Sequence, residues 1–189
     1  GTLIGDTAQV VDYGMDGSVV IAVPLDGYHF VDWSDGVATA ARTDTNVMAD
    51  LSVTANFAAD TFTLTYAAGT GGILTGDSPQ TINYGEDGTE VTAVPDAAGY
   101  HFVDWSDGIT TAARTDVNVM ADLSVTANFA SDTFTLTYAA GTGGTLTGDS
   151  PQTINYGEDG TEVIAVPDTG YDFVDWSDGV SSAARTDTN

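Results

Sequence analysis

The sequence Gly-Tyr-His-Phe-Val-Asp-Trp-Ser-Asp-Gly occupies residues 27–36 and returns unchanged at residues 99–108. A third version, at residues 170–179, differs only by Asp172 in place of the histidine. Its central tryptophan therefore recurs after 72 and then 71 residues. The three matching positions are Trp33, Trp105 and Trp176. Self-similarity at a fixed period is the signature of a repeat architecture, so we predict three copies of one small module.

The repeat divides the 189 residues into three expected domains. They are residues 1–60, residues 61–132 and residues 133–189. The first copy has no counterpart of Thr-Phe-Thr-Leu-Thr-Tyr at 61–66, so it lacks its first strand. The third has no counterpart of Leu-Ser-Val-Thr-Ala-Asn-Phe at 123–129, so it lacks its last strand. Only the middle copy is complete, and we interpret the chain as a piece of a longer array.

Segments with the two-residue period of a half-buried strand recur through the middle copy. They cover residues 62–66, 81–84, 90–94, 100–103 and 123–129. Glycine and aspartate, which are common turn residues, separate them. Only residues 110–122 leave room for a short helix or a single turn. We therefore predict an all-β or β-rich fold of tandem small modules, with about five strands in each and little helix.

Short linkers join the copies, at residues 58–60 and 130–132, with no proline-rich or serine-rich spacer. A module of this size buries only about 60% of its unfolded surface, so contacts with neighbours supply part of its stability. We expect an elongated array in which neighbouring repeats of the same chain are partners.

The charge is extreme, with 28 acidic residues against three arginines, no lysine, and a formal net charge of −25. Nucleic acid binding depends on basic residues that release counterions from phosphate, so nucleic acid is excluded as a partner. No apolar run approaches the roughly 20 residues of a membrane span, so we expect no membrane insertion.

Catalytic chemistry is not expected from this composition. Cysteine and lysine are absent, which removes thiolate nucleophiles and Schiff-base chemistry. Ser34, Asp35 and His29 lie close together in sequence, but a catalytic triad is defined by geometry. We predict that the chain is not an enzyme.

The order of motifs along the middle copy is similar to that of a known family. It comprises residues 62–66, 80–85, 94–95, 99–105 and 123–129, read as Phe-Thr-Leu-Thr-Tyr, Gln-Thr-Ile-Asn-Tyr-Gly, Val-Pro, Gly-Tyr-His-Phe-Val-Asp-Trp and Leu-Ser-Val-Thr-Ala-Asn-Phe. This order resembles the divergent branch of the internalin-type B repeat, the Listeria–Bacteroides repeat family. The resemblance implies a β-grasp-like module, found in tandem on secreted and cell-surface proteins of bacteria and acting as a spacer or adhesive stalk. It implies an extracellular or bacterial cell-surface location and brings no catalytic residues.

Nine aromatic residues at matching positions are predicted to form the core of the modules. They are Tyr28, Phe30, Trp33, Tyr100, Phe102, Trp105, Tyr171, Phe173 and Trp176. A module this small needs large aromatic side chains to bury enough apolar area. The alternative is a row of exposed platforms that stack on sugar rings, which would make a glycan the partner.

Eight aspartates are candidate calcium ligands, because calcium binds six to eight oxygen atoms. They are Asp32, Asp35, Asp104, Asp107, Asp175, Asp178, Asp60 and Asp132. The competing interpretation is that aspartate before glycine is a turn residue, and no copy has the Asp-x-Asp-x-Asp-Gly loop that ends in glutamate. No cofactor is therefore required, and calcium stays a candidate.

Each copy has one cation at one position: Arg42, Arg114 and Arg185. A lone arginine among many carboxylates is expected to form an internal ion pair or to lie over an aromatic ring. His29 and His101 give way to Asp172 in the third copy, which favours an exposed position.

Together these features favour a structural spacer segment of a bacterial secreted or cell-surface, adhesin-like repeat protein. The alternatives are a carbohydrate-binding repeat module and an adhesin stalk made rigid by calcium. Strand edges left open in the first and third copies also suggest head-to-tail self-association.

Overall fold

The computed structural model describes residues 1–96 and 99–188, and every regular element in these ranges is a β-strand. The predicted all-β class is confirmed. Residues 110–122, the one stretch with room for a helix, contain the two-residue strand β11 (Ala113–Arg114) instead.

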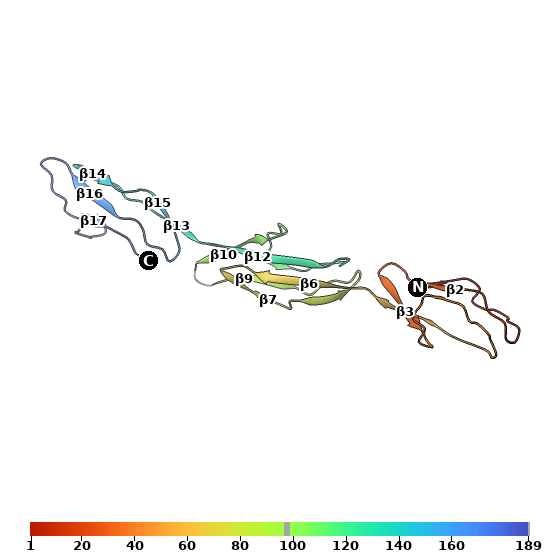
Figure 1. Cartoon of the computed structure of the whole chain (residues 1–189). Helices are drawn as coiled ribbons and strands as arrows, with labels where there is room; N and C mark the ends of the chain where they lie inside the picture. The colour runs from red at the N-terminus through yellow and green to blue at the C-terminus, as the bar shows by residue number, and fades with distance from the viewer. Residues whose placement is uncertain (97–98, 189) are drawn as a thin grey trace. The chain divides into compact units, whose positions relative to one another are not determined.

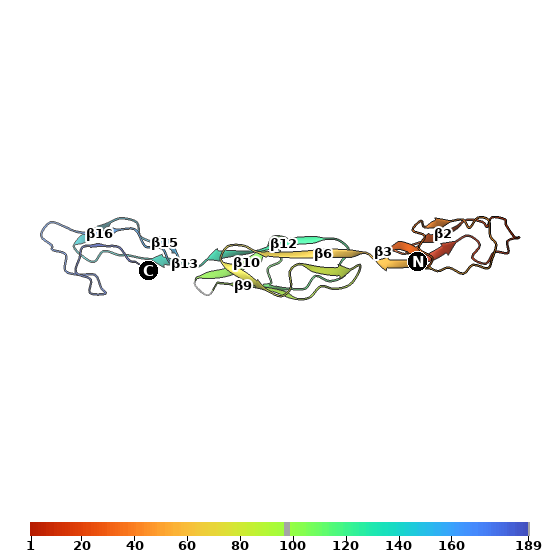
Figure 2. The ribbon, with the colours of Figure 1, turned by 60° about the horizontal axis from the view of Figure 1, so that its bottom comes forward.

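The middle repeat has seven strands in its described residues, two more than predicted. They are β6 (Thr61–Ala68), β7 (Gly72–Thr75), β8 (Gln80–Asn83), β9 (Val91–Pro95), β10 (Tyr100–Trp105), β11 and β12 (Leu123–Ser131). One sheet has the order β10-β12-β6-β8 and the other β11-β9-β7. Both views of the ribbon show β12 and β6 running alongside each other (Figures 1 and 2).

The first and third repeats contain parts of the same arrangement. The first has β1 (Thr2–Ile4), β2 (Val20–Val23), β3 (Tyr28–Trp33), β4 (Ala41–Arg42) and β5 (Ala55–Ala59), in sheets β1-β2-β4 and β3-β5. The third has β13 (Thr133–Leu136), β14 (Gly144–Thr147), β15 (Gln152–Asn155), β16 (Val163–Pro167) and β17 (Ala184–Arg185), in sheets β13-β15 and β14-β16-β17. Residues 171–176 match the β10 sequence except for Asp172 in place of His101, but they are not a strand. The reason is that β10 is defined by its pairing with β12, and no counterpart of β12 lies among the described residues of the third repeat.

A β-bulge brings Phe102 and Trp105 of the middle repeat onto one face. The antiparallel register between β10 and β12 shifts between Phe102 and Asp104, so that Phe102 lies opposite Phe129 and Trp105 opposite Ala127. Without the shift, residues three apart in a strand would point to opposite faces. The extra residue of the bulge reverses that alternation and turns Trp105 inward. The β3–β5 pair shifts at the equivalent place, between Phe30 and Asp32.

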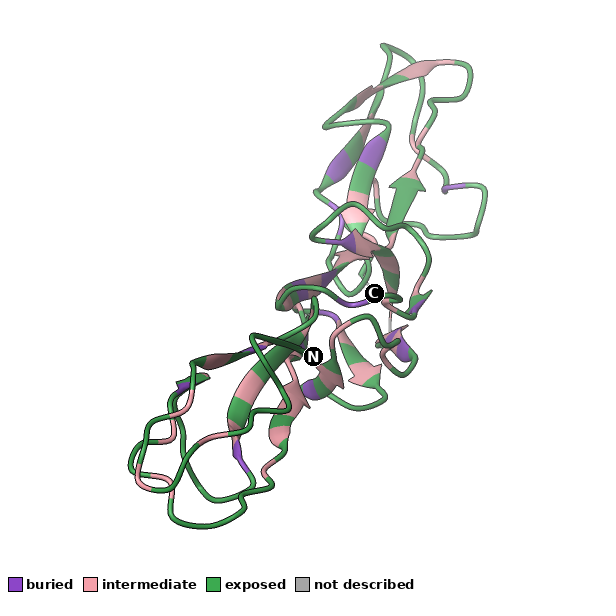
Figure 3. Cartoon of the chain, turned by 90° about the vertical axis from the view of Figure 1, so that its right-hand side faces the viewer, coloured by how far each residue is buried: buried purple, intermediate pink, exposed green. Residues whose placement is uncertain are grey.

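The buried residues of the core form short stretches along the strands. Figure 3 shows them as short buried bands that alternate with exposed residues along the strands. In β6, Leu64 and Tyr66 are buried while Thr63 and Thr65 are exposed. This alternation is the two-residue period that the sequence shows.

The chain packs as two compact units, and each unit contains one boundary between repeats. Residues 1–66, 76–91 and 113–125 form one unit, and residues 67–75, 92–112 and 126–189 form the other. The linker at Asp60 lies within the first unit and the linker at Asp132 within the second.

Candidate functional site

All three tryptophans are core residues, as predicted. Trp33, Trp105 and Trp176 are only 2%, 0% and 9% exposed. Each indole N–H also donates a hydrogen bond to a backbone carbonyl six residues further on. The acceptors are Thr39, Thr111 and Ser182, at 3.0, 3.1 and 2.9 Å. A buried indole with its donor occupied is not available to stack on a sugar.

The other predicted core aromatics are less enclosed. Phe30, Phe102 and Phe173 are half-buried, with ring centroids 6.0, 6.1 and 6.0 Å from the tryptophan of the same repeat. Tyr100 is half-buried, with its ring close to Gly71. For Tyr28 and Tyr171 the core prediction is wrong, because they are 48% and 56% exposed. The Tyr171 ring lies against Gly143 as the Tyr100 ring lies against Gly71, but more than half of Tyr171 is exposed.

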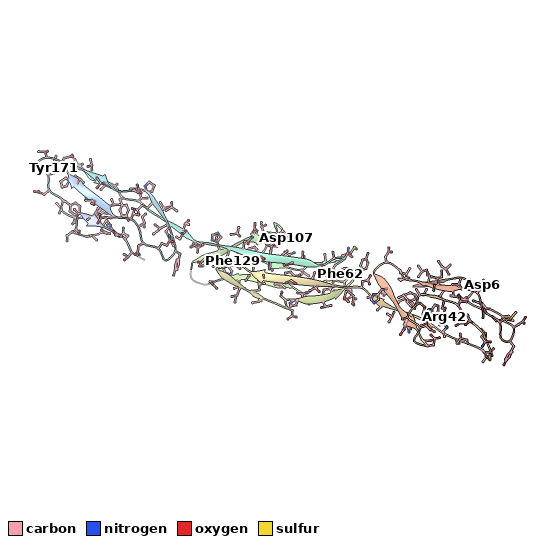
Figure 4. The ribbon with its side chains drawn as sticks, viewed as in Figure 1. Asp6, Arg42, Phe62, Asp107, Phe129 and Tyr171 are labelled. Atoms are coloured by element: carbon pink, nitrogen blue, oxygen red, sulfur yellow. The ribbon has the colours of Figure 1, made fainter. Side chains whose placement is uncertain are left out.

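The predicted internal ion pair exists in the first repeat around Arg42, which is labelled in Figure 4. Its Nη1 and Nη2 donate to Asp35 at 3.2 and 3.0 Å, and its Nε and Nη2 donate to Asp44 at 3.3 and 2.6 Å. The guanidinium also lies 4.9 Å from the centre of the Trp33 ring. Arg42 is 8% exposed, so one planar cation satisfies two carboxylates and covers the core indole.

Arg114 and Arg185 occupy the same position in the other two repeats and have an additional tyrosine partner. Arg114 donates to Asp116 and lies 5.7 Å from the centre of the Tyr66 ring. Arg185 donates to Asp178 and Asp187 and lies 5.5 Å from the centre of the Tyr138 ring. Tyr66 lies in the opening strand β6, and Tyr138 lies two residues after the opening strand β13. The described part of the first repeat has no counterpart of this tyrosine.

These contacts change the acid–base properties of the cluster. Hydrogen bonds from Arg42 and Arg185 lower the pKa of Asp35 and Asp178, respectively. The pKa of Asp187 is lowered first by Arg185 and then by Tyr138. Burial, followed by the hydrogen bond to Asp187, raises the pKa of Tyr138 to about 12. At neutral pH the cluster therefore holds charged aspartates, a charged arginine and a neutral phenol.

Most of the candidate calcium ligands accept hydrogen bonds within the protein. Asp32 and Asp104 accept from Asn56 and Asn128 across the strand pair, at 2.7 and 2.8 Å. Asp35 and Asp178 bond to arginine, as described above. Within residues 1–96 and 99–188, no three histidine, cysteine or acidic side chains gather in a way that could hold a metal ion.

Asp60 and Asp132 are the centres of two equivalent joints between repeats. The Asp60 backbone N–H donates to Gly27 of the first repeat, and its carbonyl accepts from the Tyr84 N–H of the middle repeat, both at 2.8 Å. Its carboxylate lies 2.8 Å from Nδ1 of His29. We call Gly27, His29, Asp60 and Tyr84 the first joint.

The second joint repeats this geometry with Gly99, His101, Asp132 and Tyr156. The backbone bonds from Asp132 to Gly99 and from Tyr156 to Asp132 are again 2.8 Å, and the His101–Asp132 distance is 2.7 Å. His29 and His101 have 57% of their side chains exposed, as predicted for these positions, although each has a carboxylate partner. One residue of the linker thus bonds to both repeats that it connects.

The joints and a buried glutamine are features that sequence reasoning did not identify. The Gln80 side chain is 6% exposed, and it accepts from the Thr89 N–H at 2.8 Å while donating to the carbonyls of Asp77 and Thr89 at 3.0 Å. Gln152 makes the same three bonds in the third repeat. The signal was present, because a polar residue that recurs at one place in an apolar strand pattern is a candidate for internal bonding.

Comparison with known proteins matches the whole chain to one family. The model of the divergent InlB B-repeat domain matches residues 1–61, 62–133 and 134–189. No curated protein and no solved structure matches the chain. In the described residues, no helix has the length and apolar character required to span a membrane.

Proposed function

Because the chain belongs to the divergent InlB B-repeat family, we propose that it is a structural spacer in a bacterial secreted or cell-surface, adhesin-like protein. Its role is to hold a more distal part of that protein at a distance from the surface. The work is mechanical and involves no chemical reaction.

The observation that carries this proposal is the repeated joint. A flexible tether needs no contact across its linkers, yet the same four bonding positions recur at both repeat boundaries. Each linker residue is fixed by two backbone bonds and one side-chain bond. Such joints restrict the swing of one repeat against the next, which a spacer of defined reach requires.

The charge of the chain supports the same role. A net charge of −25 on 189 residues keeps neighbouring chains apart and soluble. Repulsion of this kind suits a dense layer of stalks on a surface. It also opposes adhesion by the stalk itself to anionic polymers.

A length series tests the proposal. Chains with one, two and three further copies of residues 61–132 inserted in register are compared by small-angle X-ray scattering. A spacer with fixed joints gains an equal increment in maximum dimension for every added copy. A flexible chain would instead lengthen roughly with the square root of its number of links, and that result would contradict the proposal.

A glycan-binding screen on the same chains addresses the carbohydrate alternative. The three buried indoles leave only Tyr28 and Tyr171 of the nine aromatic residues well exposed. We expect no glycan affinity that rises with copy number. Binding that strengthens with each added repeat would favour a carbohydrate-binding module over a passive spacer.

A further inference from the structure

Each joint contains a glycine against which the tyrosine ring of the next repeat lies. In the first joint, a Cβ added to Gly27 would overlap the Tyr84 ring, and in the second, a Cβ added to Gly99 would overlap the Tyr156 ring. Both glycines have positive φ angles, of 73° and 72°. Glycine is therefore needed there for the backbone conformation and for the space that the ring occupies.

The tyrosine is held on its other side by the repeat to which it belongs. Tyr84 lies 6.3 Å from Phe62, centroid to centroid, and Tyr156 lies 6.3 Å from Phe134. Phe62 and Phe134 are the second residues of β6 and β13, two positions after the linker aspartates. The ring thus joins the opening strand of one repeat to the glycine turn of the repeat before it.

The counterparts elsewhere in the chain show what the contact changes. Tyr13 is the equivalent tyrosine of the first repeat and is 80% exposed, against 46% for Tyr156 and a half-buried Tyr84. Gly170 is the equivalent glycine of the third repeat. It has the same backbone conformation, with φ 88°, but an added Cβ there would meet no atom within 4 Å. In the joint, the glycine is therefore constrained by the neighbouring tyrosine ring as well as by its positive φ, whereas Gly170 is constrained by its φ alone.

We propose that this glycine is a socket that docks the tyrosine of the following repeat, and that docking couples the unfolding of the two repeats. The socket glycines are Gly27 and Gly99, and the docked residues are Tyr84 and Tyr156. The backbone bonds of Asp60 connect it to both Gly27 and Tyr84, and those of Asp132 connect it to both Gly99 and Tyr156. The inference goes beyond the spacer role, because it concerns how stability passes from repeat to repeat. It rests on the geometry of the joints and does not depend on the spacer role.

The experiment follows each repeat separately in one chain. The indole N–H groups of Trp105 and Trp176 are bonded within the middle and third repeats, so their NMR signals report the folding of those two repeats. Urea titrations are recorded for the wild type, Gly99→Ala, Tyr156→Ala and the double variant. Gly170→Ala is the matched control, since it adds the same methyl group at a similarly positive φ, 88° against 72°, but meets no ring.

In the wild type we expect the two indole signals to disappear at one urea concentration. In Gly99→Ala and Tyr156→Ala the signals should disappear at separate concentrations, with the third repeat unfolding first. Gly170→Ala should lower the midpoint of the third repeat by backbone strain alone, and by less than Gly99→Ala does. The double variant should lose little more than Tyr156→Ala plus the backbone strain that Gly170→Ala measures, because the methyl group then has room.

Two results would overturn the proposal. One is a wild type whose two signals already disappear as far apart as in Tyr156→Ala. The other is a Gly99→Ala chain that behaves like Gly170→Ala. If Gly99→Ala does not fold, Tyr156→Ala alone decides the question, since it removes the docked ring without adding bulk.

Discussion

The hydroxyl of Tyr138 donates a hydrogen bond of 2.6 Å to Oδ2 of Asp187, and so connects the opening segment of the third repeat to the segment that follows β17. Tyr66 makes the same bond to Asp116 in the middle repeat, at 2.7 Å. In both places the aspartate also binds the arginine of the repeat. The bond therefore links residues that are 50 positions apart in the middle repeat and 49 apart in the third.

Removing that hydroxyl should weaken the module. Tyr66→Phe keeps the ring, which is 5% exposed, and deletes only the bond to Asp116. Because the acceptor is charged, we expect a loss of about 1–2 kcal/mol in the free energy of unfolding. Urea denaturation followed by the Trp105 indole signal measures it. Tyr13→Phe, at an 80% exposed site, is the control, and an equal effect there would argue against the assigned role of Tyr66.

The same tyrosine hydroxyl groups should make the folded protein less stable at alkaline pH. Burial, with the bonds to Asp187 and Asp116, raises the pKa of Tyr138 to about 12 and raises that of Tyr66 as well. An unfolded tyrosine ionises near pH 10, so the contribution of these groups is complete below that pH. It is lost as the pH rises from there through the folded-state pKa. A phenolate absorbance titration should show late-ionising tyrosines in the folded chain that disappear in urea.

The paired N–H groups of the Arg42 guanidinium should contribute to the stability of the fold in addition to its charge. Arg42→Ala leaves Asp35 and Asp44 without their cation and uncovers Trp33. The carboxylates are about one third exposed, so we expect a loss of about 2 kcal/mol, below the range for a fully buried pair. Arg42→Lys should recover only part of it, because an ammonium group cannot bind both carboxylates through paired N–H groups. Equal stability of wild type and Arg42→Ala would refute an internal role for the arginine.

The third repeat supplies a natural substitution for the joint. Asp172 stands where the other copies have His29 and His101. Transferred to the second joint as His101→Asp, it places a carboxylate beside Asp132. We expect a loss of about 0.5–1 kcal/mol at low salt, since both positions are well exposed. The loss should shrink in 1 M sodium chloride, where the screening length is about 3 Å. His101→Gln, which removes the bond without adding charge, separates repulsion from the lost contact.

Salt should stabilise the whole chain through its net charge. Screening reduces the mutual repulsion of 28 acidic residues, so the melting temperature should rise with sodium chloride. The candidate calcium ligands that bond to arginine, asparagine and histidine already have partners. We therefore predict that calcium, compared with sodium at equal ionic strength, gives no additional rise. A further increase that EDTA reverses would instead support a stalk made rigid by calcium.

Recurrence made the central cluster predictable. A tryptophan and an arginine that return at fixed places in three copies of a small module have few roles other than packing together. The structure places Arg42 over Trp33 and Arg185 5.1 Å from the centre of the Trp176 ring. The two-residue alternation likewise identified β6, β8, β9, β10 and β12, because more buried and less buried residues alternate along much of each strand.

The features that the sequence did not predict depend on single residues and on contacts between residues far apart in the chain. The bulge at Val103 breaks the period that reveals strands, so the shared face of Phe102 and Trp105 could not be read from alternation. The strand β7 follows a glycine run and lies outside the five predicted strand segments. The contact between Gly27 and Tyr84 joins two repeats, and a pattern within one repeat carries no information about it.

The position of the arginines also affects how readily a protease can cleave the protein. Trypsin cleaves only after lysine or arginine, and this sequence contains three arginines and no lysine. Their side chains are 7%, 3% and 13% exposed, and carboxylates hold their guanidinium groups. The folded chain therefore offers a trypsin-like protease no freely accessible cleavage site. The contacts that hold each module together also protect it from proteolysis.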